Sequence, residues 1–255
     1  MKPYHLVLPV TLLMTGCFSS SSSDSENDTD NSSGATPVIP AEISGSYSGT
    51  FDDSSSELFI ASDGRTVLTT SQHDGIGFYG TSTIEEPELV FVGDVHGITA
   101  TSDITARMQI NDSLSGDYSW QIYTSSALGT LSYNKDIGFD DQTTSLDKFV
   151  GSWSTATGQT IEVSDTGVII EYVDSERGCT ETGLFELIDP AQNEFSVTLN
   201  SLDCSDPEMN NTYQGIGYFT NGTSEQEQIK FTVFTDDPWE SFQHSSRSEI
   251  YTKSD

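Results

Sequence analysis

The sequence predicts an all-β protein of two small antiparallel barrels, each of about eight strands, placed after a disordered tether. Short runs that alternate apolar and polar residues recur, as in QTIEV and NEFSVTL, and Gly, Asp, Asn and Ser interrupt them at close intervals. Alternation with a period of two is typical of half-buried strands. Helical periodicity is scarce. An eight-stranded closed barrel has room inside for side chains or one small ligand.

The chain consists of two similar halves, which predicts two domains. ISGSYSGTF around Gly45 and Tyr47 matches FVGSWSTAT around Gly151 and Trp153, at an offset of 106 residues. The first half ends in GTLSYNK and the second in SEIYTKS. Two domains of about 100 residues are the natural division. A single domain made of both halves is the alternative.

The first residues are typical of a secretory signal. Lys2 supplies a positive charge, and the apolar stretch from Leu6 to Met14 is too short for a bilayer span of roughly 20 residues. Ser, Asp, Asn and Gly dominate residues 18–37, a composition that predicts a disordered tether. An ordinary signal peptide, in which Cys17 stands near the cleavage site by chance, is the alternative to a lipoprotein signal.

The segment MTGC, which ends at Cys17, resembles the lipobox of bacterial lipoproteins, in which the cysteine becomes the lipid-modified first residue. The resemblance implies a membrane anchor through lipid on Cys17. Phe18 stands where Asp is associated with retention in the inner membrane, which favours the outer membrane, with a periplasmic or surface-facing domain. The expected segments are a lipoprotein signal peptide (1–16), a tether (17–40), a first barrel domain (41–136), a linker (137–146) and a second barrel domain (147–255).

The chain is strongly acidic, with 9 Lys and Arg against 40 Asp and Glu and a net charge of −31. Nucleic-acid binding is disfavoured, because phosphate contacts need clustered Lys and Arg. Contact of the barrels themselves with an anionic membrane surface is disfavoured for the same reason. An acidic surface keeps an exported protein soluble, and it would also attract a basic protein partner.

Cys179 and Cys204 remain as a pair if Cys17 carries lipid. An exported compartment is oxidising, so the pair is predicted to form a disulfide. The bridge would close a loop of about 25 residues and contribute on the order of 3 kcal/mol. A metal site is the alternative, but no histidine has ligand spacing with these cysteines. We therefore expect no metal site and no cofactor.

Catalytic motifs are missing from the sequence. It contains no Gly-x-Ser-x-Gly elbow, no His-Glu-x-x-His motif and no Gly-rich phosphate loop. His73, His96 and His244 occur in turn-like segments and are expected to be exposed loop residues rather than catalytic bases. Carboxylates are so frequent that a pair of them indicates nothing. The chain is therefore expected not to be an enzyme, and a hydrolase that uses carboxylates is the remaining catalytic alternative.

The segment FVGSW resembles the Gly-x-Trp opening strand of lipocalins and other calycins. In those barrels the Trp closes one end, and an Arg near the last strand packs across it. The resemblance implies that Trp153 pairs with Arg247 of SSRSEIYTK, whereas the first half has Tyr47 and lacks the Arg. RGCTETGLFELIDPAQNEFSVTLNSLDC also resembles repeats in lipoproteins of Gram-negative bacteria, a family that implies location and fold but no known chemistry.

These expectations combine into a lipid-anchored envelope protein with a non-enzymatic binding or supporting role. A hollow calycin-like barrel would hold a small apolar ligand. Inhibition of a secreted basic hydrolase, a lysozyme or a protease, is the alternative, because an acidic surface suits a basic enzyme. The sequence does not indicate which residues would bind the ligand.

Overall fold

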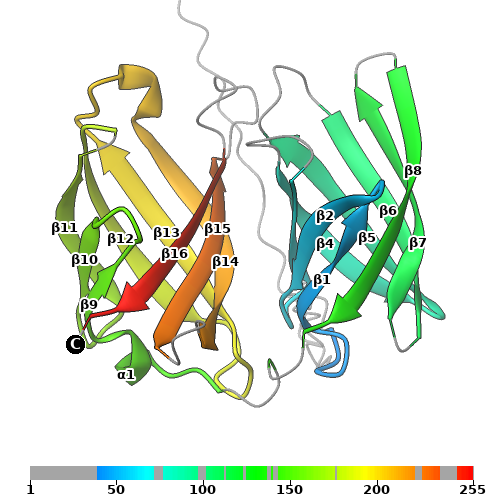
Figure 1. Ribbon diagram of the computed structural model, residues 1–255, viewed down its shortest axis with the longest axis horizontal. Coiled ribbons are helices and arrows are strands. Elements are labelled where there is room, and N and C mark those ends of the chain that lie inside the picture. The colour runs from blue at the N-terminus through cyan, green and yellow to red at the C-terminus, as the bar shows by residue number, and fades with distance from the viewer. Residues whose placement is uncertain are drawn as a thin grey trace, which may run out of the picture. The chain divides into compact units, whose positions relative to one another are not determined.

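The computed structural model describes residues 39–71, 77–96, 102–111, 113–122, 125–136, 139, 143–175, 177–221, 226–235 and 246–254. These residues form two closed antiparallel barrels of eight strands each (Figure 1), which confirms the predicted fold class. Around each barrel every strand pairs with the next one in the chain, and the last strand pairs with the first. Within the described residues, no helix is long and apolar enough to cross a membrane.

The first barrel contains β1 (Gly45–Phe51), β2 (Ser54–Ile60), β3 (Arg65–Thr70), β4 (Gly77–Glu85), β5 (Glu88–His96), β6 (Ser102–Ile110), β7 (Leu114–Ile122) and β8 (Ser125–Lys135). A short helix, α1 (Leu146–Phe149), precedes the second barrel. That barrel contains β9 (Gly151–Ser154), β10 (Thr160–Val163), β11 (Val168–Asp174), β12 (Cys179–Leu187), β13 (Phe195–Leu202), β14 (Asn211–Asn221), β15 (Glu227–Thr235) and β16 (Ser246–Lys253), with a 3-10 turn at Pro207–Met209 after β13.

Large aromatic side chains fill both interiors. In the first barrel the rings of Phe51 and Phe78 lie 5.3 Å apart, and both residues are buried. In the second barrel Phe149 of α1 stacks on Phe185 at 4.8 Å and meets Phe195 edge-on at 4.9 Å. Full burial of such a side chain contributes about 1.5 to 3 kcal/mol. The alternating apolar residues of the sequence therefore form two separate cores.

Each barrel starts with the same buried aromatic arrangement. In β1 the Tyr47 hydroxyl donates a hydrogen bond to the carbonyl oxygen of Ile43, four residues earlier. In β9 the Trp153 indole nitrogen donates to the carbonyl oxygen of Phe149, also four residues earlier, at 2.6 Å. Both rings are nearly inaccessible to solvent. The offset of 106 residues between the two halves therefore relates the same structural element in both barrels.

A lysine from the last strand completes this element, which we call the closing clamp. Lys135 of β8 donates to the carbonyl oxygen of Ala41 at 3.1 Å, in the turn before β1. Lys253 of β16 donates to the carbonyl oxygen of Lys148 at 3.0 Å, in the short helix α1 before β9. The Lys253 ammonium also lies 5.1 Å from the centre of the Trp153 ring. Each clamp therefore ties the last strand to the segment that precedes the first.

A third hydrophobic cluster joins the two barrels through their outer faces. Phe59 and Val67 of the first barrel are buried against Ile216 and Phe234 of the second, together with Phe139 from the connecting segment. Such a cluster has the composition of a small hydrophobic core. The two barrels are therefore in direct contact rather than joined by the linker alone.

Polar contacts flank this cluster. The Ser62 amide donates to Glu194 at 2.8 Å, and the Ser62 hydroxyl bonds the other carboxylate oxygen. The Ser46 hydroxyl donates to the Tyr218 hydroxyl at 3.1 Å. Burial raises the pKa of Glu194, although both hydrogen bonds from Ser62 oppose this shift. At the seam, the contact between the two barrels around this cluster, these four residues are therefore hydrogen-bonded to the opposite barrel, which offsets the cost of their desolvation.

Candidate functional site

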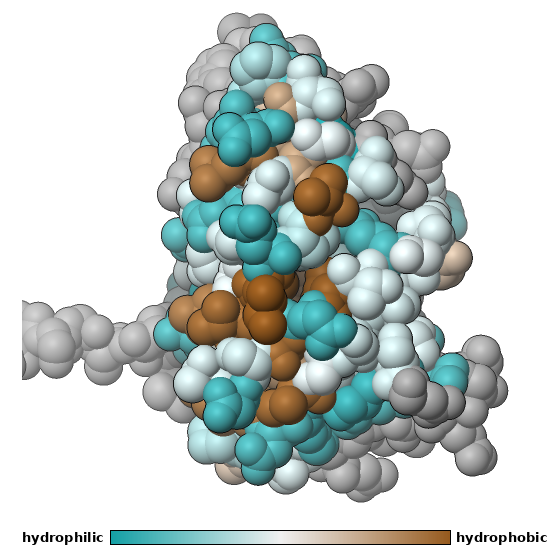
Figure 2. Space-filling model, turned by 90° about the vertical axis from the view of Figure 1, so that its left-hand side faces the viewer, coloured by the Kyte–Doolittle hydropathy of each residue, from teal (hydrophilic) through white to brown (hydrophobic). Residues whose placement is uncertain are grey.

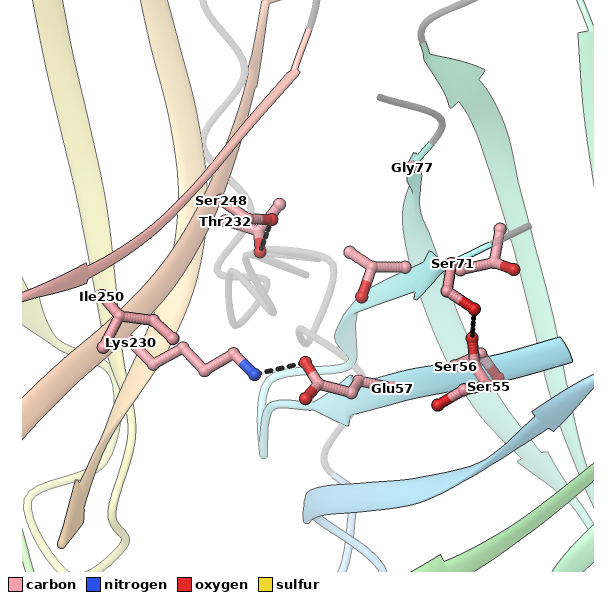
Figure 3. Close-up of a pocket in the computed structure, with 11 residues that line it drawn as sticks. Ser55, Ser56, Glu57, Ser71, Gly77, Lys230, Thr232, Ser248 and Ile250 are labelled. Atoms are coloured by element: carbon pink, nitrogen blue, oxygen red, sulfur yellow. Dashed lines mark hydrogen bonds and ion pairs between the residues drawn. The ribbon is translucent and has the colours of Figure 1, made fainter. Parts of the chain in front are cut away.

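A cleft of about 530 Å³ opens between the two barrels (Figure 3). Strands β2 and β3 supply one wall, and β15 and β16 supply the other. Hydroxyl side chains dominate the lining, which consists of Ser55, Ser56, Glu57, Thr69, Thr70, Ser71, Gly77, Lys230, Thr232, Ser248 and Ile250. A volume in this range is typical of small-molecule sites.

An ion pair crosses the cleft from one barrel to the other. The Lys230 ammonium of β15 bonds the carboxylate of Glu57 in β2. Burial tends to lower the pKa of Lys230, but the Tyr218 hydroxyl and the Glu57 carboxylate outweigh it and raise this pKa above its ordinary value. The ammonium group therefore stays charged at neutral pH. Figure 3 shows it extended across the cleft toward Glu57.

Hydroxyl groups give both walls hydrogen-bond donors and acceptors. On the second barrel, the hydroxyls of Thr232 and Ser248 lie 2.9 Å apart. On the first, the Ser71 hydroxyl donates to the carbonyl oxygen of Ser55 at 2.9 Å. A hydroxyl can donate one hydrogen bond and accept two, so these groups can also pair with a ligand. Ile250 is the single large apolar side chain of the lining, and most of the other lining residues can exchange hydrogen bonds with a ligand.

His96 lies at the seam beside the cleft, and the expectation that it is an exposed loop residue is wrong. It ends β5, pairs with Gly77 and is 4% exposed. Its ring lies 4.6 Å from the ring of Phe234, so the second barrel covers the end of its strand. Burial lowers the pKa of His96 to about 4, which keeps the imidazole neutral at pH 7. His73 and His244 lie outside the described residues.

A buried charged cluster lies inside the second barrel. Arg247 donates to Glu181 at 2.6 Å and to Glu249 at 3.2 Å. Glu181 also accepts from the Ser201 hydroxyl at 2.8 Å and from the Tyr172 hydroxyl. Burial tends to lower the pKa of Arg247, and Glu181 outweighs it, so this pKa is raised. Paired and hydrogen-bonded in this way, the cluster is part of the barrel core rather than an open site.

The structure places Lys253, rather than Arg247, over Trp153, which corrects the expected Trp153–Arg247 pair. Lys253 lies directly opposite Trp153 in the β16–β9 ladder. Arg247 comes six residues earlier in β16, which places it about 20 Å farther along the strand at roughly 3.3 Å per residue. Its guanidinium lies 5.6 Å from the Tyr213 ring instead. The shared Tyr-x-Lys endings of the two halves were the sequence signal for the lysine.

The predicted disulfide between Cys179 and Cys204 is present. It links the start of β12 to the segment after β13, and these two strands are hydrogen-bonded neighbours. Among the described residues, no group of three or more His, Cys, Asp or Glu side chains could hold a metal ion. Cys17 lies outside the described residues, so its lipid modification stays a prediction.

Several pockets lined by the described residues lie outside the barrel interiors. Besides the cleft, they occur at the seam, beside the N-terminal segment and between β10 and β11. The interiors hold large side chains such as Tyr133, Phe91 and Trp153, each 0% exposed. A small apolar ligand inside either barrel would have to displace closely packed rings of this kind. The cleft is therefore the stronger candidate for a ligand site.

No protein-family model matches the chain, and no curated protein matches it. The sequence did not indicate the cleft, because its hydroxyls come from strands that are far apart in the chain and because Ser and Thr are frequent throughout. The one usable signal is Lys230, an isolated basic residue in an apolar strand of a very acidic chain.

Proposed function

We propose that this chain is a lipid-anchored envelope protein with a non-enzymatic binding role, and that the cleft holds a small hydroxyl-rich ligand such as a short saccharide. The observation that carries this proposal is the cleft lining, in which seven of the eleven residues are Ser or Thr. The signal-like start and the Cys17 lipobox support the anchor. The two filled barrels would act as the rigid walls of the binding site.

The cleft chemistry supports binding rather than catalysis. Its lining includes neither histidine nor cysteine, and Glu57 is its single carboxylate. That carboxylate forms an ion pair with Lys230. Hydrolysis of a glycosidic bond ordinarily needs two carboxyl groups on opposite sides of the bond. A hydroxyl-rich ligand would instead exchange hydrogen bonds with the walls and gain a charge-assisted bond from the ion pair.

The experiment is calorimetric titration of the full chain with neutral trisaccharides, such as maltotriose, cellotriose and chitotriose. We expect at least one of these trisaccharides to bind. Lys230→Met and Thr232→Val should each weaken its binding by about tenfold, because each removes one good hydrogen bond to a charged or polar group. Arg107→Met is the matched control, because it also removes an ion pair, to Glu85 at 2.9 Å, but away from the cleft.

Equal binding by the wild type and both cleft variants would place the ligand elsewhere. The absence of binding across the panel, together with a ligand-free mass when the chain is purified gently from its own host, would refute the saccharide proposal. Melting curves of each variant show whether a loss of binding reflects a loss of folding.

A second candidate function is inhibition of a secreted basic hydrolase, a lysozyme or a protease. The observation that favours it is the distribution of charge. Every Lys and Arg in the described part of the chain already bonds a carboxylate or a backbone carbonyl. Most Asp and Glu side chains in that part of the chain form no ion pair with a Lys or Arg. Salt-sensitive inhibition of a basic lysozyme or protease by the full chain would support it.

A further inference from the structure

Strand β11 has an open edge toward β10. The two strands are paired at Val163 and Ile169 alone. The corresponding hairpin of the first barrel, β2–β3, is paired at five positions. A bulge in β11 between Ile169 and Tyr172 accompanies this difference. Because a bulge bends its strand and increases its twist, the residues from Ile170 onward diverge from β10.

The two hairpins begin with the same turn, so the divergence is local to β11. In the first barrel the Gly64 amide donates to the carbonyl oxygen of Ala61 at 2.9 Å. In the second barrel the Gly167 amide donates to the carbonyl oxygen of Ser164 at 3.1 Å. Both glycines have positive φ, 91° and 80°. The β2–β3 hairpin therefore shows how a hairpin with this turn pairs along its length, and the β10–β11 hairpin differs from it.

A slot lies between the diverging strands. It has a volume of about 230 Å³ and is bordered by Gln159 and Thr160 on one side and by Val173 on the other. The side-chain amide nitrogen of Gln159 is buried and donates to no acceptor in the described part of the chain. An orphaned buried donor is costly, and an added backbone carbonyl would satisfy it.

Apolar side chains surround the open edge on the outer face of the barrel. Val168, Ile170 and Val173 of β11 are 43%, 52% and 69% exposed, and Leu202 of β13 is 56% exposed. Figure 2 shows hydrophobic side chains gathered in the middle of the face that β10, β11 and β12 present, with hydrophilic ones around them. An exposed apolar edge of this kind is a template for another strand.

The charges around this face are negative. Glu162, Glu171 and Glu186 are exposed on β10, β11 and β12. The described bases of the second barrel are already engaged, as shown above, so these carboxylates keep their charge uncompensated. A second copy of this chain would bring the same acids to the face and would be repelled. A cationic partner would be attracted.

We propose that the open edge of β11, from Ile170 to Val173, is a docking site for an extended segment of a cationic protein, which adds a strand in the slot. Backbone hydrogen bonds to β11 supply the geometry, and alternate apolar residues of the segment cover Ile170 and Val173. Its basic residues face Glu162 and Glu171. The site shares no residue with the cleft, so it stands apart from saccharide binding and provides a surface for the basic-partner candidate.

The test uses the full chain and three fluorescent octapeptides: (Lys-Val)4, (Glu-Val)4 and (Lys-Pro)4. The first combines positive charge with strand-forming alternation. The second reverses the charge, and the third keeps the charge but lacks amide donors at proline. We expect anisotropy to show binding of (Lys-Val)4 at least tenfold tighter than that of the other two. Hydrogen exchange should show new protection of the Ile170–Val173 amides.

Two β11 variants and one matched control locate the site. Ile170→Lys and Val173→Lys place a positive charge on the edge, and each should weaken (Lys-Val)4 binding at least tenfold. Val92→Lys is the control, because Val92 is 51% exposed in β5, a strand paired on both sides. Glu171→Gln, which leaves the apolar edge intact, should weaken binding less and reduce its salt dependence.

Several outcomes would overturn the proposal. Equal binding of (Lys-Pro)4 would show attraction by net charge alone. Unchanged affinity in both lysine variants, or protection confined to other strands, would place the peptide elsewhere. Concentration-dependent dimerisation that Ile170→Lys abolishes would make a second copy the occupant. None of these results bears on the saccharide titration, so the two proposals fail independently.

Discussion

Replacement of His96 by Asn should make the protein more resistant to acid. His96 is buried at the seam, with its ring against Phe234 and its Nδ1 atom without a partner in the described part of the chain. Protonation in the folded state would place a charge in this apolar environment, and burial therefore lowers the pKa to about 4. The unfolded chain protonates near the ordinary value of about 6.5.

The size of the effect follows from these two values. Between them, the unfolded state binds more protons than the folded state, so the free energy of unfolding falls as pH falls. From pH 7.5 to pH 4.5 the loss due to His96 is about 2.5 kcal/mol, at 1.36 kcal/mol per pKa unit. Burial raises the pKa values of Asp94 and Glu194, so these two carboxyl groups raise the free energy of unfolding as pH falls, opposite to the effect of His96. Comparison with a variant cancels their contribution.

Urea unfolding of the wild type and His96→Asn at both pH values provides the measurement. The wild type should lose about 2.5 kcal/mol more than the variant on acidification. His96→Gln serves as a second neutral variant and should behave like His96→Asn. Identical acid sensitivity in all three proteins would refute the lowered pKa, and with it the burial of His96 between the barrels.

Three further changes test other features. Cys179→Ser, or reduction of the bridge to Cys204, should lower the free energy of unfolding by about 3 kcal/mol, measured with urea with and without reductant. Lys253→Met should cost about 1 to 2 kcal/mol, from the hydrogen bond and the cation over Trp153, and should change indole fluorescence; an unaltered spectrum would contradict the clamp. Arg247→Met should cost about 3 to 5 kcal/mol, because it leaves buried carboxylates unpaired; a loss below 1 kcal/mol in thermal melts would argue against the buried cluster.

The barrels were predictable because their signals are local or repeated. Alternating runs such as NEFSVTL define strands directly, and the matched segments around Gly45 and Gly151 define two copies. Both glycines have positive φ, 138° and 115°, a conformation that favours glycine over other residues. A repeated conformational requirement of this kind is preserved in the sequence as a repeated residue.

The remaining features depend on contacts that no local pattern encodes. His96 is followed by glycine and resembles a turn residue, but its burial depends on Phe234 in the other barrel. The cleft brings together common hydroxyl residues from both barrels. Arg247 was placed by resemblance to other barrels, whereas the strand register of this chain brings Lys253 to Trp153.

The closing clamps have a consequence for the order in which each barrel folds. Seven of the eight ladders in a barrel join strands that are consecutive in the chain, and such hairpins form quickly. The eighth must bring together residues as distant as Tyr47 and Lys135, and loop-closure entropy opposes it. We expect that ladder to form last. The clamp lysines lie on this ladder in both barrels. The hydrogen bonds of each clamp therefore stabilise the strand pairing that is slowest to form and most costly in entropy.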